Sequence, residues 1–251
     1  EPSTRTRLSF AIAAEKLGIK IFESSDSISA NQKGEMLKHE IETYVSMGIE
    51  ILVLRTKENN IDDYRVFEDV GVISGGFGNK SHPTQALIDI STLDSFDKLK
   101  GTSVPITYIG DVKHSRVFES GRQLLSLLGY KVGVFTNQNL LPEDKSNVEI
   151  YESWDEVFEN TNAIELLRVQ KERIQENEKI DFEDYVKNYQ LTNKVLKKSR
   201  DDLIVLHPMP INVGIEISED AIKDRKIKYL NQLSYAIPSR IAAFKYVKGE
   251  L

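Results

Sequence analysis

The chain has 251 residues, which is long enough for one large domain or two modest ones. Its formal net charge is −6 and the charges are mixed along the sequence, which excludes a nucleic-acid binder with a basic stripe. It has no cysteine, which excludes disulfides, thiolate metal sites and cysteine nucleophiles, and no apolar run approaches the ~20 residues of a membrane span. With no visible signal peptide, we expect a cytoplasmic protein that uses neither nucleic acid nor membrane as a partner.

Helix-like and strand-like segments alternate along the chain. Hydrophobic spacing predicts, in chain order, a helix over 7–18, a strand over 19–22, a helix over 34–47, strands over 49–54 and 70–73, a glycine-rich loop over 74–78 and a helix over 83–93. The pattern restarts near residue 100 with a strand over 104–109, a helix over 116–129, a strand over 131–135, a helix over 154–160, a strand over 163–167, a helical pattern over 181–199 and a strand over 203–206. This alternation predicts an α/β fold with parallel sheets covered on both faces, in two domains.

Hydroxyl groups and a guanidinium gather where the first helix begins, in Ser3, Thr4, Arg5 and Thr6. Unpaired N–H groups and the positive end of the helix dipole make such a terminus suitable for a phosphate. The alternative is an ordinary N-cap beside a solvated Arg, which is the commoner use of one such residue.

Four residues that can be cationic follow predicted strands or stand in the loop beyond: Arg55, His82, Arg168 and His207. Ligands of open α/β sheets bind at the carboxyl ends of the strands, so this set indicates an anionic ligand. Taken singly, each is more often a surface ion-pair partner or a structural histidine. The four histidines lack metal-ligand spacing, there is no Walker A motif, and the 74–78 segment lacks the dinucleotide spacing.

Several collinear motifs resemble the catalytic chains of the aspartate carbamoyltransferase family over nearly the whole sequence. They are 1–7, Ser29 with Lys33-Gly34-Glu35, Arg55, His82-Pro83-Thr84-Gln85, Gly110-Asp111 leading to Arg116, 168–173 and His207-Pro208-Met209-Pro210. The resemblance implies two doubly wound parallel-sheet domains with the active site in the cleft between them. Residues 1–99 with 236–251 would bind carbamoyl phosphate and residues 100–235 would bind aspartate.

The resemblance also implies a reaction: transfer of the carbamoyl group of carbamoyl phosphate to the α-amine of L-aspartate, in pyrimidine biosynthesis, with no cofactor and no metal. The residues implied for carbamoyl phosphate are Ser3, Thr4, Arg5, Thr6, Ser29, Lys33, Arg55, His82 and Gln85. Among these, Thr6, Arg55 and His82 would contact the carbonyl oxygen, Gln85 the carbamoyl nitrogen, and Lys33 would also take part in catalysis. The residues implied for aspartate are Lys33, Arg116, Arg168, Gln170, Met209 and Pro210.

A homotrimer is implied as well, in which Ser29 and Lys33 reach into a neighbouring subunit's site; the sequence does not show whether regulatory chains bind. The family also has a first strand and helix before the residue that matches Glu1, so we expect this sequence to be truncated at its N-terminus. The resemblance further raises the expectation of a cis peptide between Met209 and Pro210, above the low general frequency of such bonds.

Two alternatives remain open at this stage. One is transfer to another amino acceptor, as in the sister ornithine family, although the chain lacks that family's cysteine signature and Arg168 suits an extra carboxylate. The other is a non-catalytic relative, because the chain departs from the family pattern at Thr56, Met36, Val213 and Ala236.

Overall fold

The structure is a computed structural model that describes residues 4–23, 37–56, 70–78, 81–170 and 180–251. The chain divides into two units, Glu1–Thr84 with Ala236–Leu251, and Gln85–Tyr235. The sequence pattern restarts near residue 100, whereas the packing assigns nearly all of the helix that begins at Pro83 to the second unit. None of the helices in the described segments combines the length and apolarity that crossing a membrane requires.

The first unit holds a parallel pair of strands with apolar clusters formed by the helices around it. Its elements are α1 (Thr4–Lys16), α2 (Leu37–Ser46), β1 (Ile51–Thr56), β2 (Gly71–Phe77) and α9 (Ala236–Val247). Helices α1 and α9 pack together, and the rings of Phe10 and Phe244 meet edge to face at 5.8 Å. Ile73 of β2 joins their cluster, whereas Ile41 of α2 packs with Leu52 in a second cluster. These apolar contacts hold β1 and the start of α1 in the same unit.

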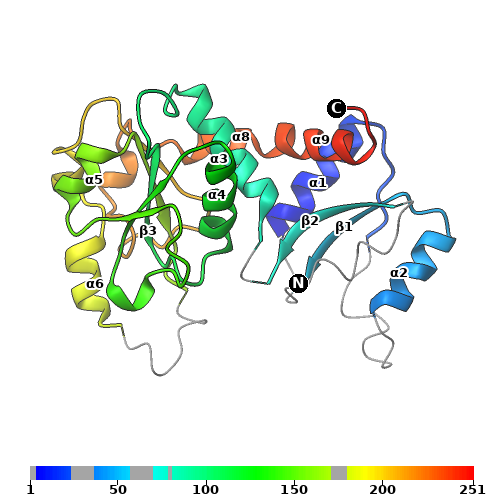
Figure 1. The fold of residues 1–251 in the computed structure, drawn as a ribbon, viewed down its shortest axis with the longest axis horizontal. Helices are drawn as coiled ribbons and strands as arrows, with labels where there is room; N and C mark the ends of the chain where they lie inside the picture. The colour runs from blue at the N-terminus through cyan, green and yellow to red at the C-terminus, as the bar shows by residue number, and fades with distance from the viewer. Residues whose placement is uncertain (1–3, 24–36, 57–69, 79–80, 171–179) are drawn as a thin grey trace. The chain divides into compact units, whose positions relative to one another are not determined.

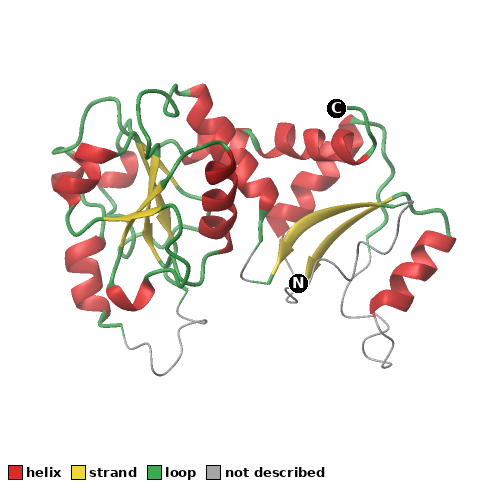
Figure 2. Cartoon of the chain, in the orientation of Figure 1, coloured by secondary structure: helices red, strands yellow, loops and turns green. Residues whose placement is uncertain are grey.

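The second unit is built on a five-stranded parallel sheet. Figures 1 and 2 show helices on both sides of this sheet. Its elements are α3 (Pro83–Ser95), β3 (Ile106–Gly110), α4 (Arg116–Leu127), β4 (Val132–Phe135), η3 (Gln138–Leu140), β5 (Val148–Ile150), α5 (Trp154–Asn160), β6 (Ala163–Leu167), α6 (Phe182–Tyr189), α7 (Asn193–Leu196), β7 (Ile204–Leu206), η4 (Ala221–Lys223) and α8 (Tyr229–Ser234). Successive residues of a strand face opposite sides, so Ile109 packs with one cluster and Tyr108 with the other. Both faces are therefore buried, as parallel sheets require.

The strand order β5-β4-β3-β6-β7 contains a topological switch point. From β3 the chain runs outward through β4 to β5, and then returns to place β6 on the other side of β3. Gly110 lies beside Leu167 in the register, so the loops that follow β3 and β6 leave the sheet next to each other. Open α/β sheets bind ligands outside the carboxyl ends of strands at such a point.

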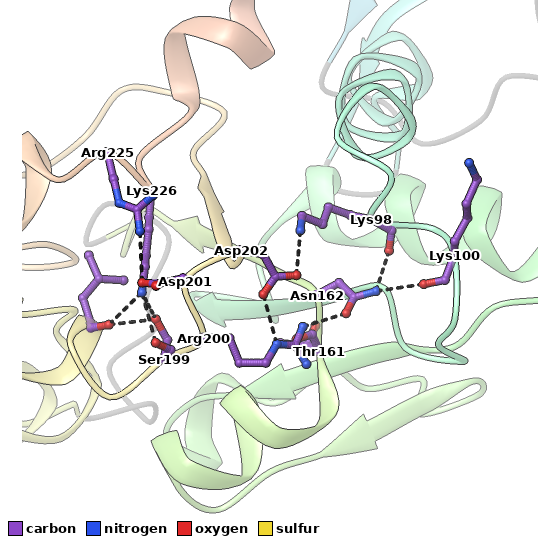
Figure 3. A network of polar contacts seen from close by, with 11 residues as sticks. Lys98, Lys100, Thr161, Asn162, Ser199, Arg200, Asp201, Asp202, Arg225 and Lys226 are labelled. Atoms are coloured by element: carbon purple, nitrogen blue, oxygen red, sulfur yellow. Dashed lines mark hydrogen bonds and ion pairs between the residues drawn. The ribbon is translucent and has the colours of Figure 1, made fainter.

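The opposite, amino edge of this sheet is tied together by polar contacts (Figure 3). Lys98 forms an ion pair with Asp202 at 3.0 Å, and the Asn162 amide donates to the backbone oxygens of Lys98 and Lys100. Arg200 in turn donates to Asn162 at 2.8 Å. These contacts join the segments that enter β3, β6 and β7, so the charges here have a structural role in the unit.

Three of the expected elements differ from the structure. Residues 19–22 are not a strand: they pair with no strand among the described residues, and Phe22 is 78% exposed. Residues 74–77 of the glycine-rich run are not a loop but the second half of β2, where Gly76 pairs with Arg55. The predicted helix over 181–199 is two helices, because Leu191 leaves the helical path to exchange backbone hydrogen bonds with Glu216 and Ser218.

Candidate active site

The first group of candidate residues lies where α1 begins and β1 ends. The Arg55 Nη1 group donates to the backbone oxygen of Gly75 at 3.1 Å and to the Thr6 hydroxyl at 3.3 Å. Thr6 is buried in the first turn of α1, whereas Thr4 and Arg5 are exposed there. A half-buried guanidinium is thus held against a helix N-terminus, and both features attract an anion.

Gly75 is fitted to this corner. A Cβ atom at Gly75 would lie 3.2 Å from the Leu54 backbone oxygen and 3.7 Å from the Thr6 methyl group. A side chain here would therefore crowd the backbone of the strand that carries Arg55, while it would only touch the Thr6 methyl group at the helix start. The glycine-rich run lets β2 approach both.

The second group begins at the start of α3. His82 is buried immediately before Pro83, and Gln85 is buried in the first turn of the helix. The Gln85 side-chain nitrogen donates to Asp89 Oδ1 at 2.8 Å, so its amide is held in one orientation. A carboxyl oxygen is an acceptor, which assigns the NH₂ group of Gln85 to Asp89 and turns its carbonyl oxygen the other way.

The third group is the loop after β6, which carries Arg168. Two buried carboxyl groups hold its backbone: Val169 N–H donates to Glu216 at 3.0 Å and Gln170 N–H donates to Asp111 at 3.1 Å. The backbone immediately after Arg168 is therefore fixed at two successive residues. This restricts where the half-buried Arg168 guanidinium can lie.

The same contacts connect this loop to the one after β3. Asp111 also accepts from the His114 backbone N–H at 3.2 Å and from the His114 ring at 2.8 Å, and the Gln170 amide donates to the His114 backbone oxygen at 3.0 Å. Arg116 follows as the first residue of α4, whose N-cap is Ser115. The loops that carry Arg116 and Arg168 thus share one hydrogen-bonded framework.

A third loop leaves the same sheet after β7. His207 is buried, its backbone N–H donates to Gln232 at 2.9 Å, and its ring nitrogen Nδ1 accepts from Met209 N–H at 2.9 Å. The Met209–Pro210 peptide is cis, which confirms the sequence-based expectation. Met209 has a φ of 64°, in the left-handed region that non-glycine residues rarely adopt.

Burial changes the pKa of Glu216, the carboxyl group that accepts from Val169 in the loop after β6. Loss of solvent raises the pKa of Glu216, although the N–H groups of Val169 and Asn212 favour its charged form. The hydrogen bonds from the loop after β6 fix the position of the Glu216 carboxyl group. They also offset part of the cost of removing its charge from water. No sequence pattern indicates this role, because Glu216 stands in a loop with no strand end to mark it.

Three residues of the expected site lie outside the described residues: Ser3, Ser29 and Lys33. The described candidates fall into the contact groups above, and the acids that support them were not predicted. Of these acids, Asp111 had a readable signal, since it directly follows Gly110 at a strand end.

Comparison with known proteins matches the chain to two domain models of one protein family. The family model described as aspartate/ornithine carbamoyltransferase, carbamoyl-P binding domain, matches residues 1–95. The model of the Asp/Orn binding domain of the same family matches residues 102–247. Together they cover most of the chain.

Curated relatives and solved structures agree with this match. The aspartate carbamoyltransferase catalytic subunit of Oceanobacillus iheyensis is 36% identical, over 100% of this chain and 80% of that protein. The catalytic subunit of M. Jannaschii aspartate transcarbamoylase has a TM-score of 0.80 at 31% identity, over 100% of this chain and 83% of that chain. The Trypanosoma cruzi aspartate transcarbamoylase in complex with carbamoyl phosphate and aspartate has a TM-score of 0.84 at 26% identity, over 97% of this chain and 81% of that chain. The chain therefore belongs to the aspartate/ornithine carbamoyltransferase family.

Proposed function

We propose that this chain transfers the carbamoyl group of carbamoyl phosphate to the α-amine of L-aspartate, giving N-carbamoyl-L-aspartate and phosphate in pyrimidine biosynthesis. Relatives named aspartate carbamoyltransferase, 36% identical over nearly the full chain, support the reaction. The observation that carries the residue assignments is the pair of anion-binding features: Arg55 at the start of α1, and Arg168 on a doubly anchored loop.

The phosphate half of the site is assigned to the first group of residues. Thr4, Arg5 and Thr6 offer hydroxyls, a guanidinium and a helix N-terminus, and Arg55 adds a second guanidinium that already contacts Thr6. Ser3, Ser29 and Lys33 are proposed to complete it. Thr6, Arg55 and His82 would donate to the carbonyl oxygen as it becomes negative, which lowers the barrier electrostatically.

Gln85 is assigned to the carbamoyl nitrogen. Because its NH₂ group donates to Asp89, its carbonyl oxygen is the atom suited to accept from the N–H groups of the carbamoyl substrate. Such an acceptor selects a carbamoyl group over an acetyl group, which has no N–H to donate.

The aspartate half is assigned to Arg116, Arg168 and Gln170, with Lys33 contributing as well. A guanidinium can bind a carboxylate through two parallel hydrogen bonds, and aspartate has one carboxylate more than ornithine. The turn at Met209 and Pro210 would direct backbone oxygens at the amine. On this assignment residues 1–99 with 236–251 bind carbamoyl phosphate and residues 100–235 bind aspartate.

The reaction then needs no covalent enzyme intermediate. The amine attacks the carbamoyl carbon, the C–N bond forms, and a tetrahedral intermediate collapses as the C–O bond to phosphate breaks. The departing phosphate accepts the proton that the amine loses. The protein supplies orientation of two bound reactants and stabilisation of the developing oxyanion.

The acceptor is tested directly by incubating the purified protein with carbamoyl phosphate and either L-aspartate or L-ornithine, and measuring the ureido product. We expect product with aspartate and little with ornithine. The reverse preference would support the ornithine-like alternative. No product with either acceptor, when carbamoyl phosphate binds by calorimetry, would indicate the non-catalytic relative that the Thr56 and Val213 departures suggest.

We also propose a cyclic homotrimer whose sites are completed by Ser29 and Lys33 of a neighbouring chain. Inactive Lys33→Ala and His82→Ala variants are dissociated, mixed equally and reassociated. A site is intact when it draws Lys33 from one parent and His82 from the other, so about a quarter of the sites should recover. No recovery in mixed trimers, verified by native mass spectrometry, would show that Lys33 does not act across a subunit boundary.

A further inference from the structure

The second unit contains two buried carboxyl groups that one amide bridges. The Gln232 side-chain nitrogen donates to Asp89 Oδ1 at 2.7 Å and to Glu165 Oε1 at 3.0 Å. Gln85 also donates to Asp89 Oδ1, at 2.8 Å. These contacts join α3, β6 and α8 inside one unit.

The orientation of the Gln232 amide is determined by its other end. Its oxygen accepts from the His207 backbone N–H at 2.9 Å, and a backbone N–H can only donate. The NH₂ group must therefore face the acids, and its two hydrogens are used by Asp89 and Glu165. Two carboxyl oxygens that contact one nitrogen are close neighbours.

The surroundings of the pair are apolar. Glu165 alternates with Ala163 and Leu167 on the sheet face that packs under α3 and α4, and its exposure is 0%. In the part of the chain that the structure describes, neither Asp89 nor Glu165 forms an ion pair with a Lys, Arg or His. Two buried charges in contact without a cation would be strongly unfavourable.

Burial acts on each of these acids and on the tyrosine beside them. It raises the pKa of Asp89 to about 7, against the lowering effect of the two glutamine donors. It also raises the pKa of Glu165 well above its usual value, and the Asp89 charge adds to this shift. Tyr108 of β3, which both acids affect, has its pKa raised well above its usual value and stays neutral.

One atom of each acid lacks a partner among the described residues: Asp89 Oδ2 and Glu165 Oε2 are buried and form no hydrogen bond to another described group. A proton shared by these two oxygens would give each of them the partner that it lacks. We propose that Asp89 and Glu165 share one proton, and that this pair acts through the two glutamines to position Gln85 and the turn that begins at His207.

The positioning role rests on the proposed function, because Gln85 and the turn matter for carbamoyl transfer only if the site is as assigned. The chain of contacts is continuous: Glu165 and Asp89 hold Gln232, Gln232 holds the His207 N–H, and Asp89 holds Gln85. Asp89 and Glu165 are thus positioning residues that act on both substrate halves at once.

Amide substitutions test the shared proton without using activity. Glu165→Gln supplies a permanent donor to Asp89, and Asp89→Asn supplies one to Glu165, so each single variant reproduces the singly protonated pair. In the double variant every orientation of the two amides brings an NH₂ group against another donor. We expect each single variant to unfold at a urea midpoint close to that of the wild type. The double variant should lose clearly more stability than the sum of the two single losses.

Amide hydrogen exchange at His207 measures directly whether Gln232 still holds the His207 N–H. We expect the His207 N–H to exchange at least ~10-fold faster in the double variant and at the wild-type rate in both singles. The kcat of carbamoyl transfer should follow the same order. Additive losses in the cycle would overturn the shared proton, and unchanged His207 exchange in the double variant would overturn the positioning role. If wild-type protein transfers no carbamoyl group but the cycle and the exchange behave as expected, the proposed function fails while the pair stands.

Discussion

Asp111→Asn is the sharpest probe of the framework behind Arg168. The Asp111 carboxyl accepts from three donors: the His114 backbone N–H, the His114 ring and the Gln170 backbone N–H, at 3.2, 2.8 and 3.1 Å. Asparagine has one acceptor oxygen, so its NH₂ group must face either His114 or Gln170. At least one hydrogen bond to a charged group is lost, at a cost of about 1.5–3 kcal/mol.

That loss should appear mainly in the aspartate half of the site. If it is expressed as displacement of the Arg168 loop, the KM for aspartate rises about 10- to 100-fold, since 1.4 kcal/mol is a factor of ten. The assay is aspartate saturation at saturating carbamoyl phosphate, and then the reverse titration. Asp202→Asn is the control, because that carboxyl is paired with Lys98 at the amino edge of the same sheet.

Two results would refute this reasoning. One is an unchanged KM for aspartate in an Asp111→Asn protein whose circular dichroism and thermal unfolding match the wild type. The other is an equal rise in KM for both substrates, which would mean that the framework does not act through the aspartate loop.

Three further predictions concern single residues. Lys226→Met should lower the free energy of unfolding by about 1–3 kcal/mol in a urea titration, because the buried Lys226 ammonium donates to three oxygens. The control is Arg225→Met at the exposed neighbouring residue, which should change the free energy of unfolding by less than ~0.5 kcal/mol. Equal effects of the two substitutions would contradict this prediction. Gly110→Ala should unfold at clearly lower urea than the wild type, because the added Cβ would lie 2.2 Å from the Leu167 backbone oxygen, and an unchanged midpoint would show that the strands can separate there. His82→Ala should lower the carbamoyl-transfer rate ~10²-fold or more with the fold retained, and near-normal turnover would exclude it as an oxyanion donor.

The sequence predicted the second unit more completely than the first. Strands that are buried on both faces read as short apolar runs, and β6 matches its predicted bounds of 163–167. The run over 19–22 is also short and mostly apolar, yet its residues form no strand, because a strand also needs a neighbour with which to pair. Composition carries no information about that neighbour.

The prediction of one helical segment over 181–199 was wrong for a related reason. Periodicity reports which side chains are apolar, and Leu191 continues the pattern. Its backbone instead pairs with the segment around Ile217, and this tertiary contact outweighs the local preference. The short β5 and α8 were missed because segments of this length give too few residues to establish a period.

The candidate site shows a similar limit. The sequence identified groups that can touch an anion, because cations that follow strands are visible in a linear pattern. The acids Asp111 and Glu216, which hold the backbone beside Arg168, accept from N–H groups that no sequence pattern displays. Their role depends on which loops the sheet brings together.

Glu165 is an instructive intermediate case, because half of its role can be read from the sequence. It stands within the apolar run 163–167, and a carboxyl inside a strand that is buried on both faces must have a hydrogen-bond partner or a proton. The existence of a partner was therefore predictable. Its identity was not, since Gln232 lies 67 residues further along the chain. An acid within a predicted parallel strand is thus a reason to search the neighbouring helices for an amide or a second acid, before any ligand is considered.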